Sequence, residues 1–330
     1  MKIALTHFRA GETDRVSLEM EKWKIALECL GHEVLFIAGS KGTSTAKTII
    51  IPELHDQNTE NLKLHKLAFG KQDETFTEDG FEQALLIQTE KIENQLIQVI
   101  ESEKLDLIIP NNMFSLGFNL PVALALYRAI IITKVRCLCH HHDFHWEREL
   151  YNHPSCSLTK IILNNYFPPK GKFCQHVVIN KIAQDELLKR KQLKTHIVPN
   201  VFDFKAPAWK KDDYNQDFRE AIGLKEEDIL VLQATRIVKR KGIEMAIDLI
   251  SKMREIKKTK QKIYLTLAGS PEAEGNYITL LKKYAAKKCV KLLFINDKIA
   301  SSRYEKDGKK YYSRDRLKES KEFIQFNSTA

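Results

Sequence analysis

The alternation of short apolar segments with segments of helical spacing limits what this chain can fold into. Residues 2–8 (KIALTHF) form an apolar run of strand length, and residues 17–31 repeat apolar side chains at helical spacing, with Ser17 as the expected N-cap. Residues 32–39 (HEVLFIAG) return to the strand pattern. Such strand–helix–strand units build parallel sheets with helices on both faces, so the sequence predicts an α/β protein.

The same alternation continues along two halves of the chain. Further strands of the first half are expected at residues 106–112, 135–141, 176–180 and 195–204, and those of the second half at 228–237, 262–270 and 290–297. The longer helices are expected at about residues 79–103, 120–132, 242–257 and 276–288. This pattern predicts two Rossmann-like, doubly wound domains with ligands at the carboxyl ends of the strands.

The second domain is expected to be incomplete, because it offers fewer strands than the first. We assign residues 1–204 to the first domain, residues 205–216 to a polar, proline-bearing hinge and residues 217–297 to a partial second domain. Residues 298–330 are strongly polar and do not continue the alternation. We therefore expect them to lie outside the fold as a polar tail.

The formal net charge of +10 is concentrated in the second half of the chain. Residues 236–330 hold 24 Lys and Arg against 11 Asp and Glu, whereas residues 1–235 hold 29 against 32. Such basic runs commonly line exposed helix faces, and the alternatives are a phosphorylated ligand or peripheral contact with an anionic membrane. Aromatic residues are not interleaved with the basic ones on the expected strands, so we expect no nucleic-acid partner.

The N-terminus and the cysteines indicate the compartment. The first apolar run ends at Arg9, too early for a signal-peptide core, and no apolar run reaches the roughly 20 residues of a membrane span. The six cysteines are expected to be free thiols in a chain without a secretion signal. The sequence therefore predicts a cytoplasmic protein and does not indicate its oligomeric state.

Two loops after expected strands have the composition of anion sites. In residues 8–15 (FRAGETDR), Gly11 lets backbone N–H groups approach an anion at a helix N-terminus, with a plain turn as the alternative. Beyond the hinge, Arg236 ends a buried strand, and Lys241 and Gly242 begin the next helix. Two fixed cations beside a helix N-terminus suit a diphosphate, because both charges and the helix dipole act on the same oxygens. A basic surface turn is the alternative.

A third loop, residues 136–150 (RCLCHHHDFHWEREL), is rich in metal-ligand side chains. A zinc site needs about four nitrogen or sulfur ligands that converge on one point. Side chains of a strand alternate between its faces, which puts Cys137, Cys139 and His141 on one face and His140 and His142 on the other. Neighbouring residues therefore cannot all converge, and we expect no metal at this loop.

The same loop is better suited to contact with a substrate. A histidine at the carboxyl end of a strand, followed by Asp143, faces the crevice, and an imidazole of near-neutral pKa suits acid/base work on a hydroxyl-bearing substrate. For three of the four histidines, the alternative role is to cap the helix expected at residues 145–148.

The order of these elements resembles a known family. The glycine loop, the strand that ends in HHHDFHWERELY, residues 198–204 (VPNVFDF) and residues 232–247 (LQATRIVKRKGIEMAI) are similar to the retaining glycosyltransferases of family 4, which have the GT-B fold of two Rossmann-like domains. The resemblance runs from Met1 to about Asp297. Its most specific element is the segment that contains Arg236.

The resemblance implies transfer of a hexose, with retention, from a nucleotide sugar to the hydroxyl of a small-molecule or lipid-linked acceptor. Arg236, Lys241 and Gly242 would bind the donor diphosphate without a metal or another cofactor. His142, with His141 as the second choice, would contact the transferred sugar, assisted by Asp143.

The resemblance also implies an acceptor side in the first domain. Its expected residues come from the first loop, the segment after Asp143 and the segment before the hinge: Gly11, Thr13, Asp14, Glu147 and Asn200.

The sequence departs from the family pattern at two places. Arg15 stands where family members usually carry a glycine, and its side chain crowds the donor or acceptor space. The family's C-terminal signature, similar to EGFGNALLEA, contacts the donor ribose and sugar hydroxyls and is absent. We therefore expect a truncated or frame-shifted member, which puts the transfer activity of this chain in doubt. A non-catalytic binding remnant and, less favoured, a metal-dependent hydrolase are the alternatives.

Overall fold

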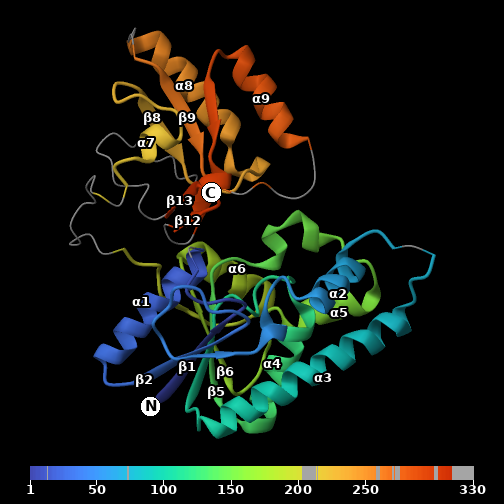
Figure 1. Ribbon diagram of the computed structural model, residues 1–330. Helices are drawn as coiled ribbons and strands as arrows, with labels where there is room; N and C mark the ends of the chain where they lie inside the picture. Colours follow the sequence, from blue (N-terminus) through green and yellow to red (C-terminus); the bar gives the residue numbers. More distant parts are fainter. Residues whose placement is uncertain are drawn as a thin grey trace. The chain divides into compact units, whose positions relative to one another are not determined.

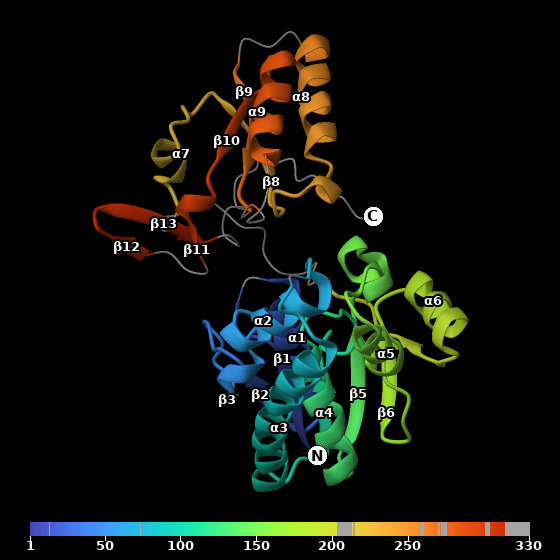
Figure 2. The ribbon, with the colours of Figure 1, turned by 90° about the vertical axis from the view of Figure 1, so that its right-hand side faces the viewer.

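The chain folds into two compact units, Met1–Asp203 and Phe204–Ala330 (Figures 1 and 2). The computed structural model describes residues 1–12, 14–72, 74–202, 213, 215–257, 261–269, 271, 276–300 and 304–313. Thr13, from the expected acceptor side, and most of the expected hinge lie outside the described residues.

The first unit is built on a parallel sheet of seven strands in the order β3-β2-β1-β4-β5-β6-β7. The strands are β1 (Lys2–His7), β2 (Glu33–Ala38), β3 (Thr48–Ile50), β4 (Leu107–Pro110), β5 (Arg136–His141), β6 (Cys174–Val178) and β7 (His196–Ile197). From β1 the sheet grows to one side through β2 and to the other through β4. This reversal of strand order creates the switch point at which such sheets bind ligands.

Helices cover both faces of this sheet (Figure 1). On one face, α1 (Arg15–Cys29) packs Met20 and Trp23 against Leu5 and Phe36 of the sheet. The other face carries α2 (Thr59–Phe69), α3 (Glu78–Ser102), α4 (Leu120–Thr133) and α5 (Ser157–Tyr166). A separate small cluster joins α6 (Lys181–Lys191) to β6. The α/β fold expected from the sequence is confirmed.

Helix α1 begins two residues before its expected N-cap. The Asp14 carboxylate accepts the backbone N–H groups of Val16 at 3.0 Å and Ser17 at 3.1 Å, and the Ser17 hydroxyl donates to the same carboxylate at 2.7 Å. Asp14, not Ser17, is therefore the N-cap. A carboxylate at this position satisfies free N–H groups and is stabilised by the helix dipole, which explains why the helix starts here.

The second unit contains a parallel three-stranded sheet in the order β10-β9-β8. Its strands are β8 (Ile229–Gln233), β9 (Ile263–Leu267) and β10 (Lys291–Phe294). Helices α8 (Ile243–Lys257) and α9 (Tyr277–Lys287) pack on one face of this sheet through Ile247, Ile250 and Leu281. The other face packs against the short helix α7 (Phe218–Ala221).

The expectation that residues from 298 onward lie outside the fold is wrong for residues 299–300 and 304–313. They form a small sheet of β11 (Ile299–Ala300), β12 (Tyr304–Lys306) and β13 (Lys309–Ser313). Tyr312 of β13 is only 2% exposed and packs its ring edge-on against Phe218 at a centroid distance of 5.1 Å. The small sheet thus helps to cover the face of the β8–β10 sheet that would otherwise expose apolar side chains. Residues 314–330 lie outside the described residues.

None of the helices in the described parts of the chain combines the length and apolar composition that crossing a membrane requires.

Replacing Tyr312 should destabilise the second unit. Tyr312→Ala removes a buried ring from the cluster around Phe218 and leaves a cavity, so we expect a loss of about 3 kcal/mol. Hydrogen exchange followed by mass spectrometry should show faster exchange of the β8 and β9 amides. Tyr311→Ala, at the half-buried neighbouring position, is the matched control and should have a smaller effect. Unchanged exchange in Tyr312→Ala would show that the small sheet does not stabilise this unit.

Candidate functional site

Polar side chains gather where three neighbouring strands of the first unit end. His7 is the last residue of β1, Asn111 and Asn112 follow β4, and His141 is the last residue of β5. Strand β4 pairs in parallel with β1 on one side and with β5 on the other. All three carboxyl ends therefore lie at the same edge, beside the switch point.

Asn111 connects all three strand ends. Its backbone N–H donates to the Thr6 carbonyl oxygen at 2.8 Å, and its own carbonyl oxygen accepts from His7 Nδ1 at 2.7 Å. Its side chain donates to the Ile109 carbonyl oxygen at 2.9 Å and accepts from His140 Nδ1 at 3.0 Å. Because these oxygens accept from the two rings, both histidines carry a proton on Nδ1, and in the neutral ring Nε2 is an acceptor.

Asn112 fixes the turn that follows β5. It has a φ of 59°, in the left-handed region that asparagine adopts more readily than most residues. Its backbone N–H donates to the His140 carbonyl oxygen at 2.8 Å. Its side-chain oxygen accepts the backbone N–H groups of His142 at 3.0 Å and Asp143 at 3.4 Å, and its amide donates to the Asp143 carboxylate at 2.7 Å. One side chain therefore positions both expected substrate contacts.

His142, the leading candidate from the sequence, lies at this edge and is 8% exposed. Its ring lies 4.4 Å from that of His140, and within the described part of the chain neither of its ring nitrogens has a hydrogen-bond partner. Burial lowers the pKa of His142 well below its usual value, and the neighbouring His140, His7 and Arg15 lower it further. A neutral imidazole offers one donor and one acceptor, which is a suitable pair for a sugar hydroxyl.

His141, the second choice from the sequence, points to the face of the sheet opposite to His142. It is 1% exposed, its Nδ1 lies 2.6 Å from the Ser115 hydroxyl, and its Nε2 lies 3.0 Å from His176 Nδ1. Both ring nitrogens are occupied within the protein. The alternation of faces along β5 was correctly expected, and it is what removes His141 from the edge.

The remaining expected residues of the first unit surround this edge. Asp143 forms an ion pair with Arg148, and Glu147 lies in the short helix η2 (His145–Glu147). Desolvation by the surrounding groups raises the pKa of the Glu147 carboxyl, and the nearby Asp143 raises it further, although the residue as a whole is exposed. Asn200 follows β7, and its buried side-chain oxygen has no partner among the residues that are described.

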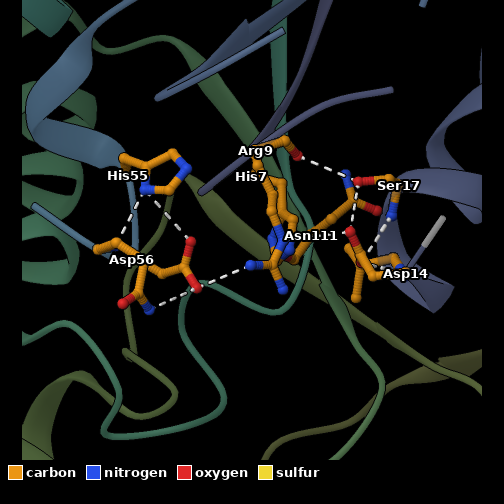
Figure 3. A network of polar contacts seen from close by, with 9 residues as sticks. His7, Arg9, Asp14, Ser17, His55, Asp56 and Asn111 are labelled. Atoms are coloured by element: carbon orange, nitrogen blue, oxygen red, sulfur yellow. Dashed lines mark hydrogen bonds and ion pairs between the residues drawn. The ribbon is translucent and has the colours of Figure 1, made fainter. Parts of the chain in front are cut away.

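A charged network that the sequence did not single out extends from the first loop (Figure 3). Arg9 lies between two carboxylates, donating to Asp14 at 3.3 Å and to Asp56 at 2.8 Å. His55 Nδ1 lies 3.5 Å from Asp56, but it accepts the Gln57 backbone N–H at 3.0 Å, so it does not pair with Asp56 as a cation. The network ties the N-cap of α1 to the segment after β3. A lone arginine and aspartate in a loop carry no distinctive sequence pattern, so only the fold reveals the pairing.

Gly11 makes a close backbone approach that only glycine allows. Its φ is 67°, and a Cβ atom at this position would lie 2.4 Å from the Ser44 backbone nitrogen. Its carbonyl oxygen accepts the Thr43 backbone N–H at 2.9 Å. This contact gives a structural reason for the glycine beside its expected role near an anion.

The expected diphosphate segment belongs to the second unit. Arg236 follows β8 and is exposed, Lys241 ends the short helix η4 (Lys239–Lys241), and Gly242 directly precedes α8 with a φ of 60°. The Gln233 side chain donates to the Lys241 carbonyl oxygen at 3.0 Å and so fixes the turn. The structure places all three predicted residues in one connection, between the carboxyl end of β8 and the N-terminus of α8.

Two relatives can be aligned with most of this chain. The chain is 40% identical over 306 residues to the mannosylglucosylglycerate synthase of Petrotoga mobilis, which covers 88% of this chain and 69% of that protein. It is 36% identical over 311 residues to the mannosylglucosylglycerate synthase of Thermotoga maritima, which covers 91% of this chain and 70% of that protein. The chain belongs to the mannosylglucosylglycerate synthase family. The expected class of enzyme, a glycosyltransferase, is thereby confirmed.

The fold of this mannosylglucosylglycerate synthase family member is similar to that of a solved structure. Anabaena Alr3699/HepE, in complex with UDP and glucose, matches with a TM-score of 0.54 at 14% sequence identity, over 89% of this chain and 69% of that chain. At this identity the likeness concerns the fold alone, and it confirms the expected GT-B class. No protein-family model matches the chain.

The charge of Asp14 should stabilise the first unit in a pH-dependent way. Burial raises the pKa of this carboxyl, but His7, the Ser17 hydrogen bonds and Arg9 outweigh it, so the net pKa lies below its usual value. Asp14→Asn keeps a capping oxygen and removes the charge, so we expect a loss of about 1 kcal/mol of unfolding free energy at pH 7.

Because the folded-state pKa is lowered, this stabilisation exists above the unfolded pKa of about 3.9 and disappears as the pH falls through the folded value. Urea denaturation of both proteins between neutral and acidic pH measures it. Glu28→Gln, which removes an exposed ion pair with Lys24 at the other end of α1, is the control and should cost at most a few tenths of a kcal/mol. A difference that stays constant down to acidic pH would contradict the assignment.

Proposed function

We propose that this chain forms mannosylglucosylglycerate by transferring a mannosyl group from a nucleotide sugar to glucosylglycerate, with retention of configuration. The observation that carries the proposal is its 40% identity to the Petrotoga mobilis enzyme of that name over 88% of the chain. The retaining mechanism follows the family 4 glycosyltransferases that the sequence resembles.

The leaving diphosphate is assigned to the connection between β8 and α8. Negative charge develops on the diphosphate as the glycosidic bond to the nucleotide breaks, while the anomeric carbon becomes positive. Arg236 and Lys241 supply fixed positive charge at a helix N-terminus, which acts mainly in the transition state. With these cations in place, we propose that transfer requires no metal ion or other cofactor.

The transferred sugar is assigned to His142. Two buried ring nitrogens without partners among the described residues would cost about 1–3 kcal/mol each if they stayed unsatisfied. One sugar hydroxyl can accept a hydrogen bond from the protonated ring nitrogen, and a second hydroxyl can donate to the other ring nitrogen. Its lowered pKa keeps the imidazole neutral, so His142 orients the sugar and does not compete with the developing positive charge.

The acceptor is an anion, and Arg15 is the residue that we assign to its carboxylate. Arg15 is the first residue of α1, its side chain is exposed, and its charge reaches His142. A guanidinium matches a carboxylate by two parallel hydrogen bonds. The arginine that departs from the family pattern of a glycine thus becomes a specificity residue for a glycerate acceptor.

The proposed reaction can be tested with the whole chain, nucleotide-activated mannose and glucosylglycerate. UDP-, GDP- and ADP-linked donors should be compared, with the product identified by mass spectrometry and its anomeric configuration by NMR. We expect α-linked product from an α-linked donor, at a rate that does not depend on added Mg²⁺ or Mn²⁺. Absence of product with every donor, or inverted product, would contradict the proposal.

The effect of alanine substitutions on kcat should distinguish the proposed diphosphate residues from the other basic residues nearby. Arg236→Ala and Lys241→Ala should each lower kcat by roughly 10²–10³-fold, as removal of a transition-state donor does in other enzymes. Lys239→Ala, on the same short helix, is the matched control and should leave kcat nearly unchanged. Equal effects at all three positions would indicate a general electrostatic field and not a defined site.

Arg15→Gln should raise the KM for glucosylglycerate by about tenfold or more, because it removes a charge-assisted hydrogen bond of about 1.5 kcal/mol or more. The substitution should change kcat little. It should not change the KM for glucosylglycerol, a neutral analogue that lacks the carboxylate. Lys63→Gln, on an exposed part of α2, serves as the control for loss of one positive charge. An equal rise in KM for both acceptors would exclude carboxylate recognition by Arg15.

A further inference from the structure

Five potential metal ligands meet on the face of the sheet opposite to His142. Strand β5 supplies Cys137, Cys139 and His141, and β6 supplies Cys174 and His176. The parallel register puts Cys137 beside Cys174 and Cys139 beside His176. All five side chains are between 1% and 9% exposed, beneath the helices that cover this face.

Their ligand atoms form two groups of three that share Cys139 Sγ. The three sulfur atoms of Cys137, Cys139 and Cys174 lie within 4.8 Å of one another, and so do Cys139 Sγ and one nitrogen each of His141 and His176. Cys137 Sγ and Cys139 Sγ are 3.6 Å apart, and His141 Nε2 and His176 Nδ1 are 3.0 Å apart. A tetrahedral zinc ion with bonds of about 2.0–2.3 Å holds its ligand atoms roughly 3.3–3.8 Å apart, close to both distances.

The His141 ring is also oriented as in a metal site. The Ser115 hydroxyl oxygen lies 2.6 Å from Nδ1, where it can accept a hydrogen bond from Nδ1–H and leave the Nε2 lone pair directed at the cluster. Metal-ligating histidines are usually anchored in this way through their second nitrogen. A hydrogen bond between His141 and His176 would explain that pair by itself, but it would not explain why three thiols meet beside it.

We propose that this cluster binds one zinc ion, with Cys139, His141 and His176 as three of its ligands and a thiol of the neighbouring group, Cys137 or Cys174, moving closer to complete the four. Thiolate and imidazole ligands favour zinc among the common divalent cations, and each coordinating thiol releases its proton to solvent when the metal binds. Because the ligands are buried, the ion enters during folding. It joins β5 to β6 and so stabilises the strand whose end carries His142.

This proposal revises the expectation of no metal at residues 136–150. That expectation considered ligands from one strand alone, and one strand cannot enclose an ion. The ligands from β6 lie more than 30 residues further along the chain, and only the parallel pairing brings them to the same face. A site closed by four protein ligands is structural and leaves the proposed transfer free of metal chemistry.

The test is the metal content of the whole chain, produced in zinc-supplemented medium and purified without a chelator or a metal-affinity tag. We expect one zinc ion per chain by mass spectrometry of the elements. Production with cobalt should give the intense visible bands of tetrahedral Co²⁺ and a thiolate charge-transfer band in the near ultraviolet. Folded, active protein that contains neither metal would overturn the proposal, whatever the behaviour of variants.

Variants locate the ion. Cys139→Ser and His176→Gln should each abolish zinc retention and the cobalt spectrum, whereas Cys29→Ser and Cys289→Ser, at exposed positions, should retain both. If a cluster variant does not fold, the wild-type cobalt spectrum still decides between thiolate ligation and surface binding. Zinc that persists in folded Cys139→Ser, or that is lost in Cys29→Ser, would contradict the assignment. Transfer activity is measured separately, so loss of the metal and failure of the proposed reaction can be distinguished.

Discussion

The candidate site of the first unit depends on the hydrogen bonds made by two consecutive asparagines at the end of β4. Asn111 links β1 to β5 through its backbone and its amide, and Asn112 holds the turn of His142 and Asp143. Residues that follow adjacent parallel strands lie outside the regular ladder of hydrogen bonds, so both the backbone and the side chains of the two asparagines make these bonds. The asparagine side chains supply both donors and acceptors, so the backbone groups of the turn after β5 are hydrogen-bonded.

This arrangement has a consequence for electrostatics. The histidines at the edge are buried and neutral, with the pKa of His140 lowered by burial to about 4. In the neighbouring loop, Arg9 forms ion pairs with both Asp14 and Asp56. Positive charge, in contrast, is concentrated in the segment after β8 of the second unit. The first unit therefore places neutral hydrogen-bonding groups at its strand ends, with the exposed Arg15 beside them, whereas the second unit carries a run of cations after β8.

The two faces of β5 divide its histidines between two tasks. His140 and His142 lie toward α1 and the edge, whereas His141 joins the cysteines on the opposite face. A strand that served only the substrate edge would not need polar groups on its second face. The proposed metal site explains why these two neighbouring buried strands carry cysteines and histidines on this face.

The sequence by itself determined the α/β class, the alternating faces of β5, and the places of Arg236, Lys241 and His142 after the carboxyl ends of strands. These features follow from local periodicity and from short motifs, which a linear chain records directly. Only the tertiary structure showed that Asp14 is the N-cap of α1, that Tyr312 packs in the second unit, that Arg9 pairs with Asp56, and that Cys139 lies beside His176. Each of these joins groups that are close in space for reasons of chain topology, either through strand pairing or through burial against a sheet face. No local pattern of residues records which strand lies beside which, and for that reason the sequence named single residues while the fold showed their partners.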